Sequence, residues 1–225
     1  MSLMLTRLLQ LASPALPVGA YSYSQGLEWA IEAGTVKDEA SALRWMGDQL
    51  AWNIGRYEAP LLLRMMEAWR VGADATARAL DERYLAGRET AELRAETLQM
   101  GHSLRRLLAD LRELPAAFVA QVAVSPAPTF MHVWSGLAAC WQIAPGEALT
   151  AWLWSWAENQ VMAALKAVPL GQAAGQRILL ELGARIPVVV EQAMDTPDES
   201  FSNFAPGFAI ACARHETQYS RLFRS

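Results

Sequence analysis

Apolar residues recur at helical spacing along almost the whole chain, and eleven prolines fall mostly between the periodic segments. Because proline lacks an N–H group and clashes with the preceding turn, it marks the beginnings and ends of helices. The pattern predicts helices near residues 3–12, 24–33, 38–54, 60–71, 74–86, 88–112, 128–141, 146–167, 172–195 and 207–215. The valine run at 188–190 follows Pro187 and fits a helix at least as well as a strand. We therefore expect one compact all-α domain of about ten helices over residues 1–225, ending in a tail at 213–225.

Local signals support several of these boundaries. Gly34 and Gly72 stand where a helix C-cap commonly has a glycine, and Pro60 and Pro145 stand where a first helical turn begins.

Length, charge and cysteine content narrow the class of protein. A chain of 225 residues with 53% apolar residues is long enough for one domain that buries roughly 70% of its unfolded surface. The net charge of −4 argues against nucleic acid or an anionic membrane surface as a partner. Two cysteines without metal-ligand spacing indicate a reduced, cytoplasmic protein. Arg7 and Gln10 interrupt the first apolar run, so we expect an amphipathic helix there and not a signal peptide.

The segment at 88–112 carries an unusual set of carboxylates. Its apolar stripe, formed by Leu93, Met100, Leu104, Leu107, Leu108 and Leu111, continues toward the N-terminus as Glu96 and Glu89, with Glu92 beside them. These acids either are buried against arginines from elsewhere or lie on a face that a partner covers. The helix dipole alone is also enough to explain Glu89 and Glu92.

The segment at 147–166 is apolar around most of its circumference, apart from a narrow strip formed by Ser155, Asn159, Met162 and Lys166. A helix with one such strip is expected at the centre of its domain. Lys166 lies at the C-terminal end, where the helix dipole favours a cation whatever its function.

The tail at 213–225 interleaves aromatic and apolar residues with arginines, a composition that carries binding energy at protein interfaces. Two interpretations are open: a docking peptide for another protein, or a tail that folds back and completes the core. If it docks, Tyr219 and Phe223 are expected to contribute to binding and Ser225 is not.

The sequence contains no recognisable catalytic centre. His102, His132 and His215 are far apart, and no phosphate-binding loop, HExxH or CxxC motif occurs. Glu89 and Glu92 could act as an acid–base pair, but no nucleophile or metal-ligand motif accompanies them. A binding protein is therefore favoured over an enzyme.

Four blocks in the same order resemble the urease accessory protein family UreF. They are LLQLASPALPVGAYSYSQGLEWAIEAG at 8–34, RETAELRAETLQMG at 88–101, KAVPLGQ at 166–172 and RHETQYSRLFRS at 214–225. Only general helical character matches at 48–87 and 111–145.

The resemblance implies an all-helical homodimer without an active site, metal site or cofactor of its own. Its implied partners are UreD (UreH in some systems), the GTPase UreG and apo-urease, and nickel and GTP are handled by those partners. The implied role is to regulate the GTPase and help form a route for nickel during urease maturation.

The resemblance also implies partner-binding residues, taken from the matched blocks. They are Tyr21, Ser22, Glu28, Glu89, Glu92, Lys166, Gln172, Arg214, His215, Glu216, Tyr219, Arg221 and Phe223. Two other functions stay open: a purely structural helical subunit, and a small all-α metal-dependent enzyme that uses Glu89 and Glu92.

Overall fold

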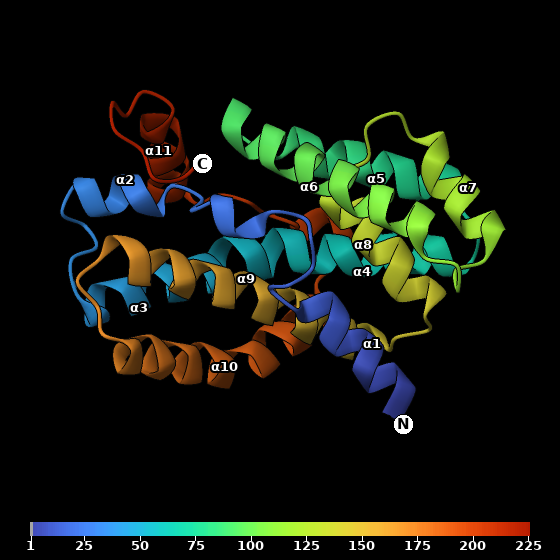
Figure 1. The fold of residues 1–225 in the computed structure, drawn as a ribbon, viewed down its shortest axis with the longest axis horizontal. Helices are drawn as coiled ribbons and strands as arrows, with labels where there is room; N and C mark the ends of the chain where they lie inside the picture. Colours follow the sequence, from blue (N-terminus) through green and yellow to red (C-terminus); the bar gives the residue numbers. More distant parts are fainter. Residues whose placement is uncertain (1) are drawn as a thin grey trace.

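The computed structural model describes residues 2–225, and this part of the chain contains helices and no strand. Figure 1 shows the helices packed around α9, with the C-terminal segment returning to the side of α2. The α-helices are α1 (Ser2–Ala12), α2 (Leu27–Glu32), α3 (Glu39–Asp48), α4 (Ala59–Arg70), α5 (Asp74–Ala86), α6 (Ala91–Asp110), α7 (Ala116–Val124), α8 (Phe130–Cys140), α9 (Pro145–Ala167), α10 (Gln172–Asp195) and α11 (Pro206–His215). The all-α prediction of about ten helices in a compact fold is confirmed.

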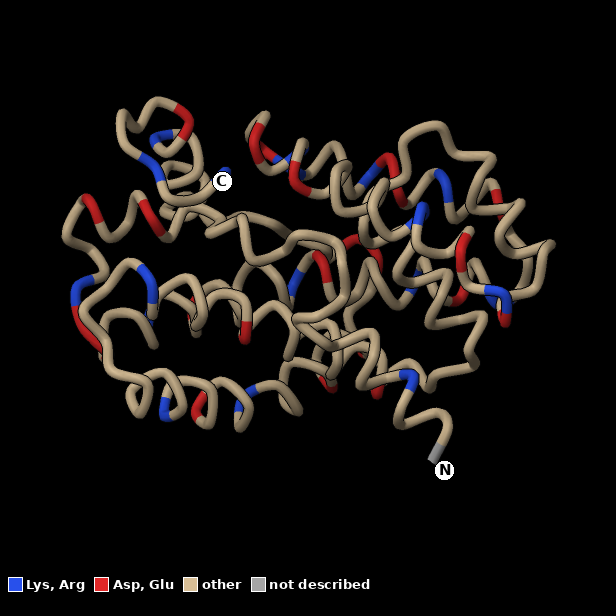
Figure 2. The backbone as a smooth tube through the Cα atoms, viewed as in Figure 1, with Lys and Arg blue, Asp and Glu red and all other residues tan. Residues whose placement is uncertain are grey.

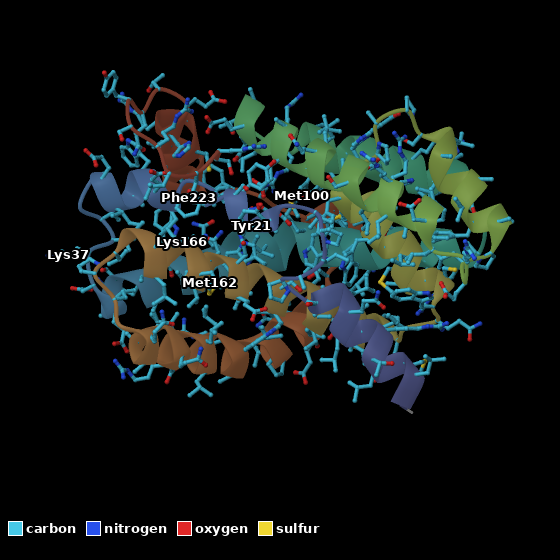
Figure 3. The ribbon with its side chains drawn as sticks, in the orientation of Figure 1. Tyr21, Lys37, Met100, Met162, Lys166 and Phe223 are labelled. Atoms are coloured by element: carbon cyan, nitrogen blue, oxygen red, sulfur yellow. The ribbon has the colours of Figure 1, made fainter. Side chains whose placement is uncertain are left out.

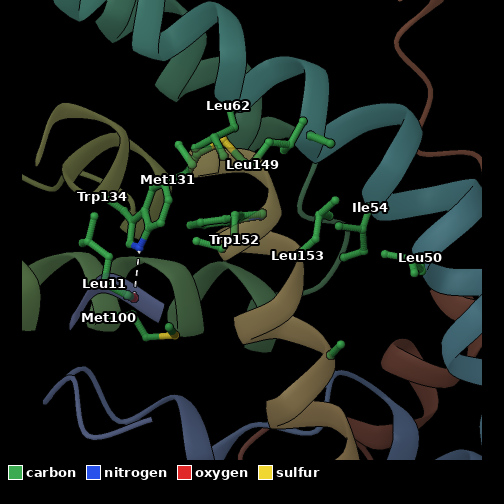
Figure 4. Close-up of a cluster of buried hydrophobic side chains, with 14 of the residues drawn as sticks. Leu11, Leu50, Ile54, Leu62, Met100, Met131, Trp134, Leu149, Trp152 and Leu153 are labelled. Carbon is green, nitrogen blue, oxygen red and sulfur yellow. Dashed lines mark hydrogen bonds between the residues drawn. The ribbon is translucent and has the colours of Figure 1, made fainter. Parts of the chain in front are cut away.

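Helix α9 lies at the centre, as its apolar circumference predicts. It packs against α10, α1, α2 and α4, which lie on different sides of it. Its Trp152 contacts Trp134 of α8 edge to face, with ring centroids 5.3 Å apart, and Trp134 donates through Nε1 to the carbonyl of Leu11 in α1 (Figure 4). Aromatic pairs of this geometry add to the free energy gained by burial and fix how three helices meet.

Pro60 lies in the first turn of α4, as predicted, but the expected break before it is absent, because the chain stays helical from α3 to α4. A π-helical stretch, Gln49–Glu58, joins α3 directly to α4. Pro60 cannot donate to the carbonyl of Arg56 four residues earlier. That carbonyl instead accepts a hydrogen bond from the backbone N–H of Ser202 at 3.1 Å. The distant partner supplies the hydrogen bond that Pro60 cannot make, and the chain stays helical through the proline.

Two glycines lie at the predicted turns, whereas one helix was not predicted from the sequence. Gly34 and Gly72 have φ values of +72° and +68°, which confirms them at turns that follow helices and require the left-handed region. Helix α7, in contrast, was not predicted, because its apolar residues show no strong helical period. Only Phe118 and Val122, one turn apart, are buried in it.

Positions of basic and acidic residues are interspersed along the backbone (Figure 2). Within residues 2–225 no helix combines the length and apolar character that crossing a bilayer requires.

Candidate partner-binding site

The C-terminal segment is held by the carboxylate of Glu28 in α2. Oε1 of Glu28 accepts the backbone N–H of Leu222 at 2.6 Å, and Oε2 accepts that of Phe223 at 2.9 Å. Glu28 is buried, so these charge-assisted bonds form away from competing water. Glu28 therefore fixes the backbone of the tail.

His215 connects Glu28 to Glu92 of α6. Its Nδ1 lies 2.6 Å from Oε2 of Glu92, its Nε2 lies 3.3 Å from Oε2 of Glu28, and the ring is completely buried. Arg221 donates to the other oxygen of Glu92 at 2.6 Å. His215 and Arg221 therefore join the carboxylates of α2 and α6 to the tail.

A second carboxylate of α6, Glu96, holds the last residue. Oε2 of Glu96 accepts the hydroxyl of Ser225 at 2.7 Å, and Oε1 accepts the side-chain amide of Gln25 at 2.7 Å. The carbonyl of Ser225 in turn accepts the backbone N–H of Ser24 at 2.8 Å. Burial raises the pKa of the Glu96 carboxyl above its usual value, and nearby Arg88 opposes this increase.

Lys166 lies between the tail and the loop that precedes α2. Its Nζ is 5.8 Å from the ring centroid of Tyr21 and 5.7 Å from that of Phe223 (Figure 3). Cations at such distances are attracted to aromatic faces. No carboxylate of the described residues lies within ion-pair distance of Lys166. The ammonium group is exposed at the end of α9 and is held over two rings.

Other parts of the tail face solvent. Tyr219 is fully exposed and Leu222 is 72% exposed, whereas Phe223 between Lys166 and Glu28 is buried. The tail therefore has an anchored side and a free side. Both sequence-based interpretations describe part of it: the anchored side completes the core, and the free side presents apolar residues.

Most residues chosen from the sequence meet at this place. Those brought together are Tyr21, Ser22, Glu28, Glu92, Lys166, His215, Glu216, Arg221 and Phe223. Glu216 belongs to the group because its Oε1 accepts the backbone N–H groups of Ala91 and Glu92 at the start of α6, at 2.8 and 3.3 Å.

Four chosen residues lie outside this network of contacts, one of them the fully exposed Tyr219. Glu89 and Arg214 are exposed, and Gln172 is exposed at the first turn of α10. Their side chains form no hydrogen bond or ion pair with another described residue that would tie them to the tail. Glu89 and Glu92 also do not form a joint site, since Glu92 is committed to His215 and Arg221.

Sequence reasoning missed Glu96, Gln25, Ser24 and Ser225 as members of the site. Glu96 did carry a signal, because it continues the buried stripe of α6. Ser225 was expected to be without importance, yet it is buried and its hydroxyl and carbonyl both form hydrogen bonds. A serine at the end of a chain has no pattern from which such contacts can be read.

The carboxylates of this site do not form a metal centre. Within residues 2–225 no group of three or more His, Cys, Asp or Glu side chains is placed to hold a metal ion. The arrangement holds a peptide segment in place and displays side chains, which is the chemistry of an interaction surface.

Comparison with known proteins identifies the family. The UreF family model matches residues 36–183, which is more than half of the chain. A "Urease accessory protein UreF" of Dechloromonas aromatica (strain RCB) is 62% identical over 224 residues, covering 99% of this chain and 98% of the relative. The chain belongs to the UreF family. A second UreF, from Azoarcus sp. (strain BH72), is 59% identical and covers 98% of this chain and 95% of the relative.

The tail and Glu28 lie outside the residues matched by the UreF family model, whereas Glu92, Glu96 and Lys166 lie within them, and the full-length relatives span the whole site. A UreF-like sequence also occurs as part of a longer protein. The "Bifunctional urease accessory protein UreEF" of Bordetella bronchiseptica is 50% identical over 225 residues, covering 98% of this chain and 52% of that relative.

Proposed function

We propose that this chain is a non-enzymatic urease maturation factor. It joins UreD (or UreH) and the GTPase UreG on apo-urease and couples GTP hydrolysis to nickel insertion. Membership in the UreF family over nearly the full length supports the accessory role. The observation that carries the proposal is the anchored tail, which exposes Tyr219 and Leu222 and places Phe223 under Lys166.

The exposed side of the tail is the proposed UreD-binding surface. Leu222 projects from a backbone that Glu28 fixes, and Tyr219 lies between it and the anchored His215, so both residues start from a restrained segment and lose less conformational entropy when they are buried. Arg221 remains partly exposed while bound to Glu92, with 41% of its side chain accessible. Aromatic and arginine residues on a rigid support are typical of binding hot spots.

Lys166 and Tyr21 form the proposed contact with UreG. Lys166 has a positive charge without a carboxylate partner among the described residues, and Tyr21 is 67% exposed. An acidic surface on the GTPase would complement this charge. In this role the chain needs no cofactor of its own, because UreG binds GTP and the partners carry nickel.

The chain is proposed to act as a cytoplasmic homodimer. Helix α1 exposes Leu3, Met4, Leu5 and Leu9, with exposed fractions between 42% and 61%, and Leu5 and Leu9, one turn apart, share a face. Adjacent apolar side chains on one amphipathic helix are favourable to bury against a second copy.

Co-purification tests the proposal. The tagged chain, expressed in a cell that carries the urease gene cluster, is expected to retain UreD, UreG and urease after affinity purification. A chain that retains urease subunits but neither UreD nor UreG would contradict the proposed role.

A purely structural subunit is the alternative that the anchored tail also allows. It would predict that substitutions of Lys166 and Tyr219 weaken assembly but leave GTP hydrolysis unchanged within the complexes that still form. Hydrolysis measured per assembled complex separates the two functions.

A further inference from the structure

A cavity with a volume of about 180 Å³ lies next to the tail site, between α9, α6, α8 and the loop that precedes α2. The polar strip of α9, formed by Ser155, Asn159, Met162 and Lys166, lines one side of it. Met100, Met162, Tyr21 and Lys166, labelled in Figure 3, also line it, and the exposed Tyr21 and Lys166 lie where it opens to solvent. The strip that interrupts the apolar surface of α9 therefore faces this cavity.

The walls are rich in aromatic rings. Six aromatic residues line the cavity: Tyr21, Tyr84, Phe130, Trp134, Trp152 and Trp156. Aromatic faces attract organic cations, and cages of such rings are a common way to bind quaternary ammonium groups. Lys166 already makes this interaction at the opening, where its ammonium group lies over Tyr21 and Phe223.

Three carboxylates and two cations line the cavity, so its charged groups sum to one negative charge when all are ionised. Arg88 and Glu58 form an ion pair at 2.5 Å and neutralise each other. Glu96 and Glu158 also line the cavity, and neither forms an ion pair with a described residue. The remaining cation, Lys166, is exposed at the end of α9, so a cationic ligand inside the cavity would meet more negative than positive charge.

Glu158 is the carboxylate without a partner. It is half-buried, and it accepts no hydrogen bond from any of the described residues. Burial raises the pKa of its carboxyl, because there is little water or positive charge to stabilise the anion. A half-buried carboxylate that lacks a partner and borders a cavity is suited to a cation from outside the chain.

The cavity suits an organic cation better than a metal ion. Within residues 2–225 no three carboxylate, imidazole or thiol groups converge to ligate a metal, and Glu96 is already engaged by Gln25 and Ser225. A cavity of roughly 150 Å³ holds a molecule of about six heavy atoms. We propose that this cavity binds a small alkylammonium compound, with its methyl groups against the tryptophan rings and its charge beside Glu158.

The test compares choline with its neutral isostere, 3,3-dimethyl-1-butanol, on the purified full chain by isothermal titration calorimetry. Both compounds have the same shape, so a difference in affinity reports the charge. Choline is expected to bind about tenfold more tightly, as cation–π attraction of 1–2 kcal/mol would give. Glu158→Gln is expected to weaken choline binding about fivefold and to leave binding of the alcohol unchanged.

Glu147→Gln is the matched control, because Glu147 is exposed on the same helix and does not line the cavity. It is expected to bind choline as the wild-type chain does. Equal affinity for choline and the alcohol would overturn the proposal, as would no choline binding at about 50 mM, which corresponds to less than 2 kcal/mol. An equal loss in Glu147→Gln and Glu158→Gln would also overturn it. Circular dichroism of both variants excludes loss of folding as the cause.

Discussion

Asp81 of α5 and His132 of α8 form a buried pair whose two members are predicted to oppose each other in the pH dependence of stability. Oδ1 of Asp81 accepts the hydroxyl of Thr129 at 2.5 Å, and Oδ2 of Asp81 lies 3.9 Å from Nδ1 of His132. That Nδ1 has no hydrogen-bond partner. Desolvation by burial raises the pKa of Asp81 to about 6 and lowers the pKa of His132 to about 4.

The contributions of Asp81 and His132 to the free energy of unfolding change in opposite directions with pH. The folded-state pKa of Asp81 is raised from 3.8, so its contribution to stability is fully present below pH 3.8 and is lost as pH rises through about 6. The folded-state pKa of His132 is lowered from 6.5, so its contribution is present above pH 6.5 and is lost as pH falls through about 4. At 1.36 kcal/mol for each pKa unit, each contribution is about 3 kcal/mol. In the wild-type chain they nearly cancel between pH 4 and 6.

A single substitution at either residue should reveal how the other residue changes the free energy of unfolding with pH. Asp81→Asn leaves His132 alone, so the free energy of unfolding should fall by about 3 kcal/mol between pH 7 and pH 4 relative to the wild-type profile. His132→Gln leaves Asp81 alone, so the free energy should rise by a similar amount over the same range. Urea unfolding followed by circular dichroism at several pH values measures both.

Asp110→Asn and His102→Gln are the controls, because both residues are exposed. They should follow the wild-type profile. Slopes of the same sign in Asp81→Asn and His132→Gln would refute the reasoning, because burial must act in opposite directions on an acid and a base.

Three further predictions concern the tail site and the dimer. Lys166→Ala should leave the far-ultraviolet circular dichroism spectrum unchanged, since a cation at a helix end contributes only about 0.3–1 kcal/mol to stability. The same substitution should alter GTP hydrolysis by UreG. Unchanged hydrolysis would reduce Lys166 to a helix-capping role. Ser225→Ala should lower the free energy of unfolding by about 1 kcal/mol and speed proteolysis of the tail, because Glu96 loses a buried donor; an unchanged digestion rate would show that this bond does not hold the tail. The double variant Leu5→Asp, Leu9→Asp should sediment as a monomer at tens of micromolar, a concentration that corresponds to an association free energy of about −6 kcal/mol. A dimer that persists in this variant would place the dimer interface elsewhere.

The fold class could be predicted because helical periodicity is a local property of the sequence. The central place of α9 followed from its nearly uniform apolar surface, and the strip ending at Lys166 marked the side that faces the cavity. The helical link between α3 and α4 could not be predicted, since the carbonyl of Arg56 that Pro60 leaves free is satisfied by Ser202, far along the chain.

The site could be predicted only in part, because the composition of the tail is a local property and its anchoring contacts are not. The composition of the tail indicated a binding segment, and its residues do meet Glu28 and Glu92. Which of them are anchors depends on carboxylates that α2 and α6 bring from almost 200 and 130 residues away. Sequence spacing within the tail therefore could not separate buried Phe223 from exposed Leu222.

The central claim is that the free side of the tail binds UreD while its anchored side maintains the fold. The direct measurement is the affinity of purified UreD for the wild-type chain, for a deletion of residues 219–225 and for Tyr219→Ala, together with the melting temperature of each. Tyr219 is fully exposed, so its replacement should not lower the melting temperature but should weaken UreD binding by at least about tenfold, as loss of an interface hot spot typically does. Deletion should abolish detectable binding. Normal UreD binding by Tyr219→Ala and by a deletion variant that melts normally would contradict the claim.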